Sequence, residues 1–283
     1  MTDFMEKQAV CVWTRAHIRG IGAWDMCTYS ADIDIWVSRR IQQRGSFEGD
    51  CVLEVVSALR AAAKAGPEPV LIDVGGNIGM FSLAAAAVGV ETHTFEPVPA
   101  NALKLMASAV RNGFGHLIHL YSMGASDDNS VFAMGVNPQN QGGVTHVPLL
   151  EEGAKFMQIP VVPLDSVLPS DAFSKRPVYL KMDIEGGECR ALRGMRRFLQ
   201  KANLIGAAFE TDKSETIACC NELMRPPNGA FQLLRFHQSL CPYDQDRRNK
   251  LPFEDLCFLK PKNVAPAVGM NATWPDNMIW KPC

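Results

Sequence analysis

The fold is decided by Val70-Leu71-Ile72-Asp73-Val74-Gly75-Gly76-Asn77-Ile78-Gly79-Met80-Phe81, a stretch that joins two apolar segments through a glycine-rich turn. Branched residues over 70–74 are typical of a parallel strand covered on both faces, and the apolar run 78–88 is typical of a covered helix. Glycines in such a turn let backbone N–H groups approach a ligand closely, and short polar side chains can hold the turn or bind the ligand. The stretch therefore predicts a nucleotide-cofactor loop between a strand and a helix. Its candidate binding residues are Asp73, Gly75, Gly76, Asn77 and Gly79.

The spacing of the glycines distinguishes between nucleotide cofactors. A dinucleotide fingerprint G-x-G-x-x-G that began at Gly75 would need glycine where the chain has Asn77 and Met80. The pattern that remains, Asp-x-Gly-x-Asn-x-Gly, resembles motif I of S-adenosylmethionine-dependent methyltransferases. The spacing thus favours a sulfonium cofactor over a nicotinamide dinucleotide.

A second strand is predicted over 91–95, and it ends at Glu96-Pro97. Glu96 follows the first strand by about 20 residues, the offset at which a carboxylate accepts the ribose hydroxyls in nucleotide-binding folds. We therefore expect Glu96 and Pro97 at the cofactor, although a solvated glutamate at a strand end is the simpler alternative.

A third block, Val178-Tyr179-Leu180-Lys181-Met182-Asp183-Ile184-Glu185-Gly186-Gly187-Glu188, identifies the family. Together with Phe95-Glu96-Pro97 it resembles FkbM-type methyltransferases, whose strands end in Lys-Ile-Asp-x-Glu-Gly-x-Glu and Phe-Glu-Pro patterns. The likeness begins near 34–48 and continues to Phe209-Glu210 in the family order. It implies a class I methyltransferase fold, an α/β Rossmann-like doubly wound sheet of about seven strands, mostly parallel with an antiparallel last strand. It also implies methyl transfer from S-adenosylmethionine, usually to oxygen.

No Gly/Ser linker, charge block or repeat divides the 283 residues, so we expect one elaborated domain. Its parts are an N-terminal cap segment at 1–64, a methyltransferase domain at 65–262 and an irregular tail at 263–283. Helical spacing over 31–64 predicts a helical cap at the cofactor mouth, where a lid could close and Glu48 could contact the cofactor. The irregular pattern over 130–163 predicts an insertion near the acceptor site.

Composition limits the partners. A formal charge of −2 with scattered Lys and Arg argues against a nucleic-acid footprint. The chain as given has no basic-then-apolar leader and no apolar run of about 18 residues, so no membrane segment is expected, and nothing indicates an oligomeric state. Nine cysteines without a C-x-x-C pair predict reduced thiols and a cytoplasmic protein. The sequon Asn271-Ala272-Thr273 leaves a domain excised from a Golgi-lumen protein as the alternative.

Strand topology predicts where the chemistry lies. Ligands of a doubly wound sheet bind beyond the carboxyl ends of its strands, where Gly75, Glu96, Asp183 and Glu210 are all expected. By resemblance, Ser126 and Asp127 follow the third strand where such folds hold adenine, and Asp183 faces both cofactor and acceptor. The cofactor should therefore lie across the first three strands.

Lys181 and Asp183 are two residues apart on the fourth strand, so their side chains share a face. A lysine in a central strand needs a carboxylate partner, for which Asp183, Glu210 and Glu96 are candidates. A structural ion pair and a catalytic role are both open for Lys181, Asp183 and Glu210. His146 and His237 are candidate general bases in loops that should face the acceptor.

Asp183 and Glu210 could together hold Mg²⁺ or Mn²⁺ that orients the acceptor, or Lys181 could take the place of the metal. We expect direct displacement, in which an acceptor oxygen attacks the sulfonium methyl in line. The expected acceptor is a hydroxyl of a sugar, a glycan or another small molecule. A catalytically inactive binding module and an NAD-dependent oxidoreductase are the alternatives. The strand-end carboxylates argue against the first and the missing glycines against the second.

We predict that the protein binds S-adenosylmethionine and S-adenosylhomocysteine but not NAD, because the glycine spacing and Glu96 suit a sulfonium nucleoside. Calorimetric titration tests this. Glu96→Ala should weaken binding by about 1–3 kcal/mol, since a ribose-facing carboxylate is lost. Micromolar binding of NAD with none of the sulfonium cofactor would overturn the methyltransferase interpretation.

Overall fold

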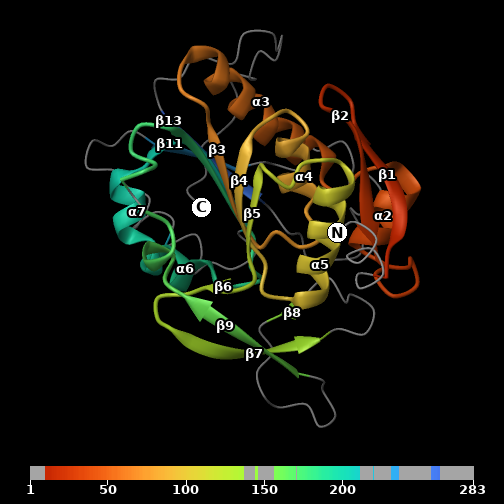
Figure 1. The fold of residues 1–283 in the computed structure, drawn as a ribbon. Coiled ribbons are helices and arrows are strands. Elements are labelled where there is room, and N and C mark those ends of the chain that lie inside the picture. Colours follow the sequence, from red (N-terminus) through yellow and green to blue (C-terminus); the bar gives the residue numbers. More distant parts are fainter. Residues whose placement is uncertain are drawn as a thin grey trace.

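The computed structural model describes residues 10–136, 144–145, 156–169, 171–210, 219, 231–235 and 256–261. A seven-stranded central sheet has the order β12-β13-β11-β10-β3-β4-β5 (Figure 1). Its strands are β3 (Val70–Val74), β4 (Glu91–Phe95), β5 (Ile118–Tyr121), β10 (Pro177–Met182), β11 (Asn203–Glu210), β12 (Phe231–Arg235) and β13 (Leu256–Pro261). The pairs from β11 to β5 are all parallel, whereas β13 runs antiparallel to β11 and β12. The mostly parallel α/β sheet of the prediction is confirmed.

Strand β3 occupies the middle of this sheet, and all five of its side chains are buried, as its branched composition predicts. Leu71 packs in the core on one face, and Val70, Ile72 and Val74 pack in the core on the other. By the same alternation Asp73 shares the face of Leu71, and Lys181 shares the face of Tyr179. Two charged side chains therefore point into the same core layer.

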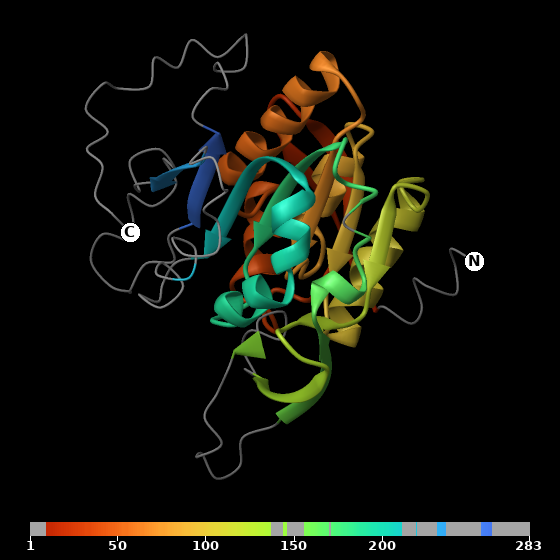
Figure 2. The ribbon, with the colours of Figure 1, turned by 90° about the vertical axis from the view of Figure 1, so that its left-hand side faces the viewer.

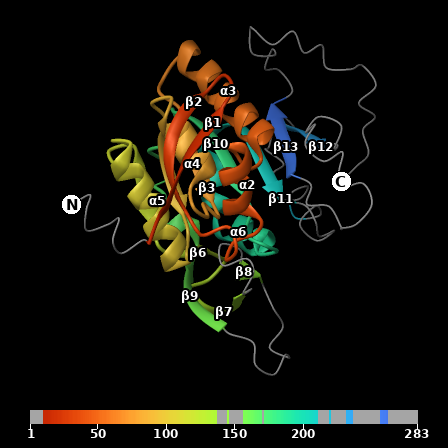
Figure 3. The ribbon, with the colours of Figure 1, turned by 90° about the vertical axis from the view of Figure 1, so that its right-hand side faces the viewer.

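Helices cover both faces of the sheet. On one face lie α3 (Gly49–Ala65), α4 (Met80–Ala86) and α5 (Pro99–Arg111), and on the other lie α6 (Glu188–Gly194), α7 (Arg196–Lys201) and the 3₁₀ turn η1 (Leu164–Ser166). Figure 2 is viewed from the side of α6 and α7, and Figure 3 from the side of α2 and α5. Helices α6 and α7 are separated at Met195, where φ is −120° and ψ is 24°.

The N-terminal segment is mostly helical over 31–64, as predicted, but residues 12–28, for which no element was predicted, form strands. Strands β1 (Val12–Ile18) and β2 (Gly22–Thr28) form an antiparallel hairpin before α2 (Val37–Arg44). The hairpin packs on α5, where Cys27 N donates to Ser108 Oγ at 2.8 Å and Asp25 N to Asn112 Oδ1 at 2.9 Å. Helix α3 is helical as expected, but its buried face belongs to the main core with Tyr179, so it is scaffold and not a detached cap.

The predicted insertion at 130–163 is less irregular than its pattern indicates. It contributes three strands to a four-stranded sheet of order β6-β9-β7-β8, which lies below the central sheet in Figure 1. These strands are β6 (Gly124–Ala125), β7 (Ser130–Val136), β8 (Val144–Thr145) and β9 (Phe156–Val162). Met134, Ile159 and Val161 pack on Val98 at the start of α5. The apolar residues Phe132 and Met134, two positions apart, are the sequence feature that indicates a strand here.

The expectation of reduced thiols is wrong for four cysteines. Cys11 pairs with Cys27, which fastens the segment before β1 to β2, and Cys189 of α6 pairs with Cys219. Cys51 is buried and takes part in neither of these disulfides. The side chains of Cys220, Cys241, Cys257 and Cys283 lie outside the described residues, as do the predicted tail 263–283 and its sequon. No helix in the described part of the chain is both long and apolar enough to cross a membrane.

We predict that, within residues 31–64, ligand binding slows amide exchange only in the turn that leads into α3. Phe47 and Glu48 line the cavity described below, whereas Val52, Val55 and Leu59 are already buried in the core. Peptides covering 45–49 should gain protection with S-adenosylhomocysteine, and peptides covering 52–59 should not. Equal gains across both would show that α3 moves as a lid, and no gain at 45–49 would show that this turn is no gate.

Candidate active site

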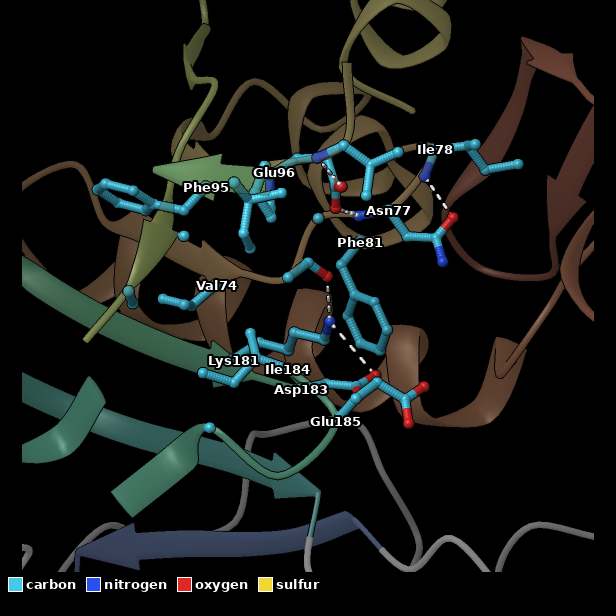
Figure 4. Close-up of a pocket in the computed structure, with 18 of the residues that line it drawn as sticks. Val74, Asn77, Ile78, Phe81, Phe95, Glu96, Lys181, Asp183, Ile184 and Glu185 are labelled. Atoms are coloured by element: carbon cyan, nitrogen blue, oxygen red, sulfur yellow. Dashed lines mark hydrogen bonds and ion pairs between the residues drawn. The ribbon is translucent and has the colours of Figure 1, made fainter. Parts of the chain in front are cut away.

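A cavity lies beyond the carboxyl ends of β3, β4 and β10, at the edge that strand topology predicts (Figure 4). The turn after β3 forms one wall, and the segment 181–187 forms another. Of the predicted residues, those that line it are Glu48, Gly75, Gly76, Asn77, Glu96, Pro97, Lys181 and Asp183. These predicted residues therefore lie around one cavity.

The turn after β3 depends on glycine. Gly75 and Gly79 have φ of 85° and 98°, in the left-handed region. A Cβ at Gly75 would overlap the carbonyl oxygen of Asp183, so the turn packs directly on the segment after β10. The N–H groups of Gly75 and Gly76 both donate to the Phe95 carbonyl, at 2.9 and 3.0 Å, which ties the turn to β4. Gly79 lies just before α4 and does not line the cavity, so it affects the site only through the shape of the turn.

Strained backbone gathers at this cavity. Four non-glycine residues in the described part of the chain have positive φ, and three of them, Glu48, Asn77 and Glu185, line the cavity. Such conformations each cost about 1–3 kcal/mol and persist where the surroundings enforce them, which is common at functional sites. This clustering makes the cavity a candidate functional site independently of any motif.

Glu96 is buried, with 4% of its surface exposed. Its Oε2 accepts from Asn77 N at 2.7 Å, and its Oε1 accepts from Val98 N at 2.9 Å and from Asn101 Nδ2 at 3.3 Å. Burial raises its pKa to about 7, although the backbone N–H groups, the Asn101 amide and Lys181 oppose the rise. A carboxylate has about four lone-pair sites, so capacity remains for a ribose hydroxyl. The solvated-glutamate alternative is wrong.

The amide of Asn101 connects Glu96 to the N-terminal hairpin. Asn101 Oδ1 accepts from the Tyr29 hydroxyl at 2.8 Å, which directs Nδ2 toward Glu96. Tyr29 follows β2, and the Lys104 ammonium lies 4.3 Å from its ring centroid. Neither Tyr29 nor Asn101 was found from sequence, because no local pattern predicts a contact between residues so distant in the chain.

Lys181 is buried between two carboxylates. Its Nζ lies 3.6 Å from Asp73 Oδ1 and 3.6 Å from Asp183 Oδ2, and it donates to the Gly75 carbonyl at 2.7 Å. The Phe81 ring stands beside the ammonium in Figure 4, with its centroid 5.2 Å from Nζ. Asp183 is thus one partner, as predicted, but the second is Asp73 and not Glu96. Asp73 lies behind the cavity wall, where Ser82 Oγ donates to its Oδ2 at 2.5 Å and its Oδ1 accepts no hydrogen bond.

Glu188 holds the segment after β10. Its Oε1 accepts from Ile184 N at 3.0 Å and Gly186 N at 3.2 Å, and burial raises its pKa. These bonds shape the loop that carries Asp183 and Glu185 into the cavity. Glu188, the last glutamate of the FkbM-like block, therefore holds the backbone of this loop in place.

Other predicted residues lie elsewhere. Gly124 and Ala125 line the cavity, whereas Ser126 and Asp127 do not, and Asp127 pairs with Arg190 at 2.7 Å on the surface. The second sheet supplies an apolar wall that sequence reasoning missed, made of Phe132, Met134, Ile159 and Val161. Glu210 ends β11, but its side chain lies outside the described residues, as do His146 and His237.

Three features thus converge on one cavity: the glycine turn after β3, the buried carboxylate of Glu96 after β4, and the Lys181–Asp183 pair at the end of β10. The sequence profile of the methyltransferase FkbM domain matches residues 73–219, which include all three. The chain belongs to this family. It follows that the protein is a member of an S-adenosylmethionine-dependent methyltransferase family, as its motifs indicate, and the NAD-dependent alternative is not supported.

Solved structures of other methyltransferases resemble this fold at low identity. A methyltransferase FkbM from Methylobacillus flagellatus KT has 19% identity and a TM-score of 0.46. The match covers 72% of this chain but only 47% of that longer chain. A SAM-dependent methyltransferase from Agrobacterium tumefaciens has 11% identity and a TM-score of 0.48, covering 87% of this chain and 69% of that one. An rRNA methylase from Streptococcus thermophilus has 11% identity and a TM-score of 0.44, covering 74% and 94%. No curated protein matches by sequence.

We predict that Tyr29→Phe weakens binding of S-adenosylhomocysteine by about 1 kcal/mol, because the Asn101 amide loses the bond that orients it toward Glu96. Affinity of the unmodified protein should fall as pH drops through about 7, where Glu96 becomes protonated and no longer accepts hydroxyl donors as a carboxylate. In the variant this midpoint should move to higher pH, because the Asn101 bond lowers the pKa of Glu96.

Calorimetry from pH 6 to 8 measures both effects. Tyr121→Phe is the matched control, because its hydroxyl lies beside His93 Nδ1 and not beside Glu96. An equal change in both variants, or an unmoved midpoint in Tyr29→Phe, would contradict the predicted link.

Proposed function

We propose that the protein transfers a methyl group from S-adenosylmethionine to a hydroxyl of a sugar, a glycan or another small molecule. The observation that supports this most is Asp183, which lines the cavity with its carboxylate 3.6 Å from the ammonium of buried Lys181. The pair stands at the carboxyl rim of the sheet, where ligands of doubly wound folds bind, and it offers a proton acceptor there.

The residues present fit the cofactor. Gly75 lets the turn pack directly on the Asp183 carbonyl, and Glu96 retains acceptor capacity for a ribose hydroxyl. The turn Gly75–Gly79 and Glu96 would hold its nucleoside, and the apolar wall from Phe132 and Ile159 would suit its base. When bound, the cofactor supplies an activated methyl group on a sulfonium centre.

The chain's own contribution is alignment and proton transfer. Lys181 is held by the Gly75 carbonyl and Asp73, so it fixes Asp183 from one side. In that position the Asp183 carboxylate accepts the proton from the acceptor hydroxyl as the oxygen attacks. The apolar wall and Phe81 keep bulk water from the reacting groups. No covalent enzyme intermediate is required.

The position of Lys181 also affects the hypothesis that Asp183 and Glu210 hold a metal ion. A cation already stands beside Asp183, so the carboxylate has a charge partner without a divalent ion. We therefore favour the version in which Lys181 takes the place of Mg²⁺ or Mn²⁺. This version needs no contribution from Glu210.

Two disulfides support an oxidising compartment over the cytoplasm, because such bonds persist chiefly in secreted and luminal proteins. The Golgi-lumen alternative agrees with this and with a glycan acceptor. Nucleic acid is the competing acceptor class, since an rRNA methylase is among the similar folds. The acceptor screen below separates these classes.

We predict that Asp183→Asn lowers methyl transfer by about 100-fold or more, because the amide cannot take the proton. Labelled methyl transfer by the unmodified protein is first measured on monosaccharides, glycans, hydroxylated small molecules and RNA. The rate with the best of these acceptors is then compared between the unmodified protein and Asp183→Asn. Asp127→Asn is the matched control, since its carboxylate pairs with Arg190 outside the cavity. Cofactor affinity should be nearly unchanged in both variants.

Chelation by EDTA should leave the rate unchanged if Lys181 is the partner of Asp183. A rate abolished by EDTA and restored by magnesium or manganese would instead establish the metal version. Cofactor binding with no transfer to any acceptor class would favour an inactive binding module.

A further inference from the structure

Three metal-ligating side chains converge at the edge of the central sheet, at the opposite end of β4 from the cavity. Glu91 and His93 are two residues apart on β4 and share a face, and His119 stands opposite His93 in the parallel pairing of β4 with β5. Their ligand atoms all lie within 4.8 Å of one another. This is the one group of three or more such residues in the part of the chain that the structure describes.

Both imidazoles direct Nε2 at the same oxygen. Glu91 Oε1 lies 3.1 Å from His93 Nε2 and 3.2 Å from His119 Nε2. Charge-assisted N–H···O bonds are shorter, at about 2.7–2.9 Å. Two ligand atoms bound about 2.0–2.1 Å from one zinc ion at a tetrahedral angle lie about 3.3 Å apart, close to the observed spacing.

Neighbouring groups orient these ligands. His93 Nδ1 lies 3.0 Å from the Tyr121 hydroxyl, a contact that leaves Nε2 as the lone-pair nitrogen when Nδ1 donates. Arg176 takes the other carboxylate oxygen, Glu91 Oε2, at 2.8 Å and is itself held by the Glu68 carbonyl at 3.1 Å. Glu91 therefore stays turned toward the histidines, and Arg176 offsets its charge, which limits the affinity for a cation.

We propose that Glu91, His93 and His119 form a binding site for a divalent transition-metal ion of the zinc class. Imidazole and carboxylate ligands suit such ions, and three protein ligands leave a fourth position for water. His93 is buried, whereas 47% of the His119 side chain is exposed, so the ion enters from the solvent side. The two rings are stacked with centroids 4.6 Å apart, and binding requires the exposed His119 ring to turn toward the common point.

The proposed ion links the edge strand β5 to β4. It is separate from Asp183 and from the proposed methyl transfer, so it does not depend on that function. Its binding should raise the melting temperature of the protein, because a ligand that binds only the folded state stabilises it.

Zinc titration of the EDTA-dialysed full chain by calorimetry, with Co²⁺ absorption as the spectroscopic probe, tests the proposal. We expect one ion at this site. Its affinity should fall at least tenfold in His119→Ala and in His93→Gln, with loss of the imidazole-dependent Co²⁺ bands. Zinc should raise the melting temperature of the unmodified protein but not that of His119→Ala.

His116→Ala is the matched control, because this exposed histidine lies three residues before His119 and contacts only the Gly113 carbonyl among the described hydrogen bonds. It should bind zinc like the unmodified protein. His119 is exposed, so its variant should fold, and equal melting temperatures of the metal-free forms verify this. Zinc affinity and Co²⁺ bands that are the same in His119→Ala as in the unmodified protein, or no binding to either, would overturn the proposal.

Discussion

The buried ammonium of Lys181 is the constraint on which the rest of the site depends. Taking a charge out of water costs several kcal/mol, and the cost is offset only by close partners with good geometry. Lys181 has three such partners: Asp73 on β3, the Gly75 carbonyl in the turn after β3, and Asp183 just after β10. Loss of any one would remove part of the compensation for this buried charge. The ends of β3 and β10 are therefore held together at the rim where the cavity opens.

That arrangement explains why the turn after β3 tolerates so little change. Gly75 packs against the Asp183 carbonyl, so the turn and the loop after β10 share one contact surface. Asn77 donates its N–H to Glu96 from a left-handed conformation, which joins the same turn to the end of β4. Positive φ at Glu48 and Glu185 extends this strain to both sides of the cavity. The backbone of the site is thus pre-formed by contacts among three strand ends.

The segments that support the site come from distant parts of the chain. The hairpin β1–β2 reaches Glu96 through Tyr29 and Asn101, and the second sheet supplies an apolar wall through Met134 and Ile159. Neither role was predicted. The hairpin lies in the part of the N-terminal segment 1–64 for which no element was predicted, and the second sheet was interpreted as an irregular insertion. In both cases local alternation was present, but only packing against α5 determines which face is buried.

The sequence by itself determined the features that depend on local chemistry. The composition of the chain located β3 and β4 to within about two residues, and glycine spacing with strand-end acids identified the family and several residues that line the cavity. Tertiary structure alone decided which charges meet. Asp73 rather than Glu96 became the second partner of Lys181, Asp127 turned to Arg190 on the surface, and Cys11 and Cys189 found distant thiols. Such pairings depend on distances in space between segments, and a linear pattern does not contain them.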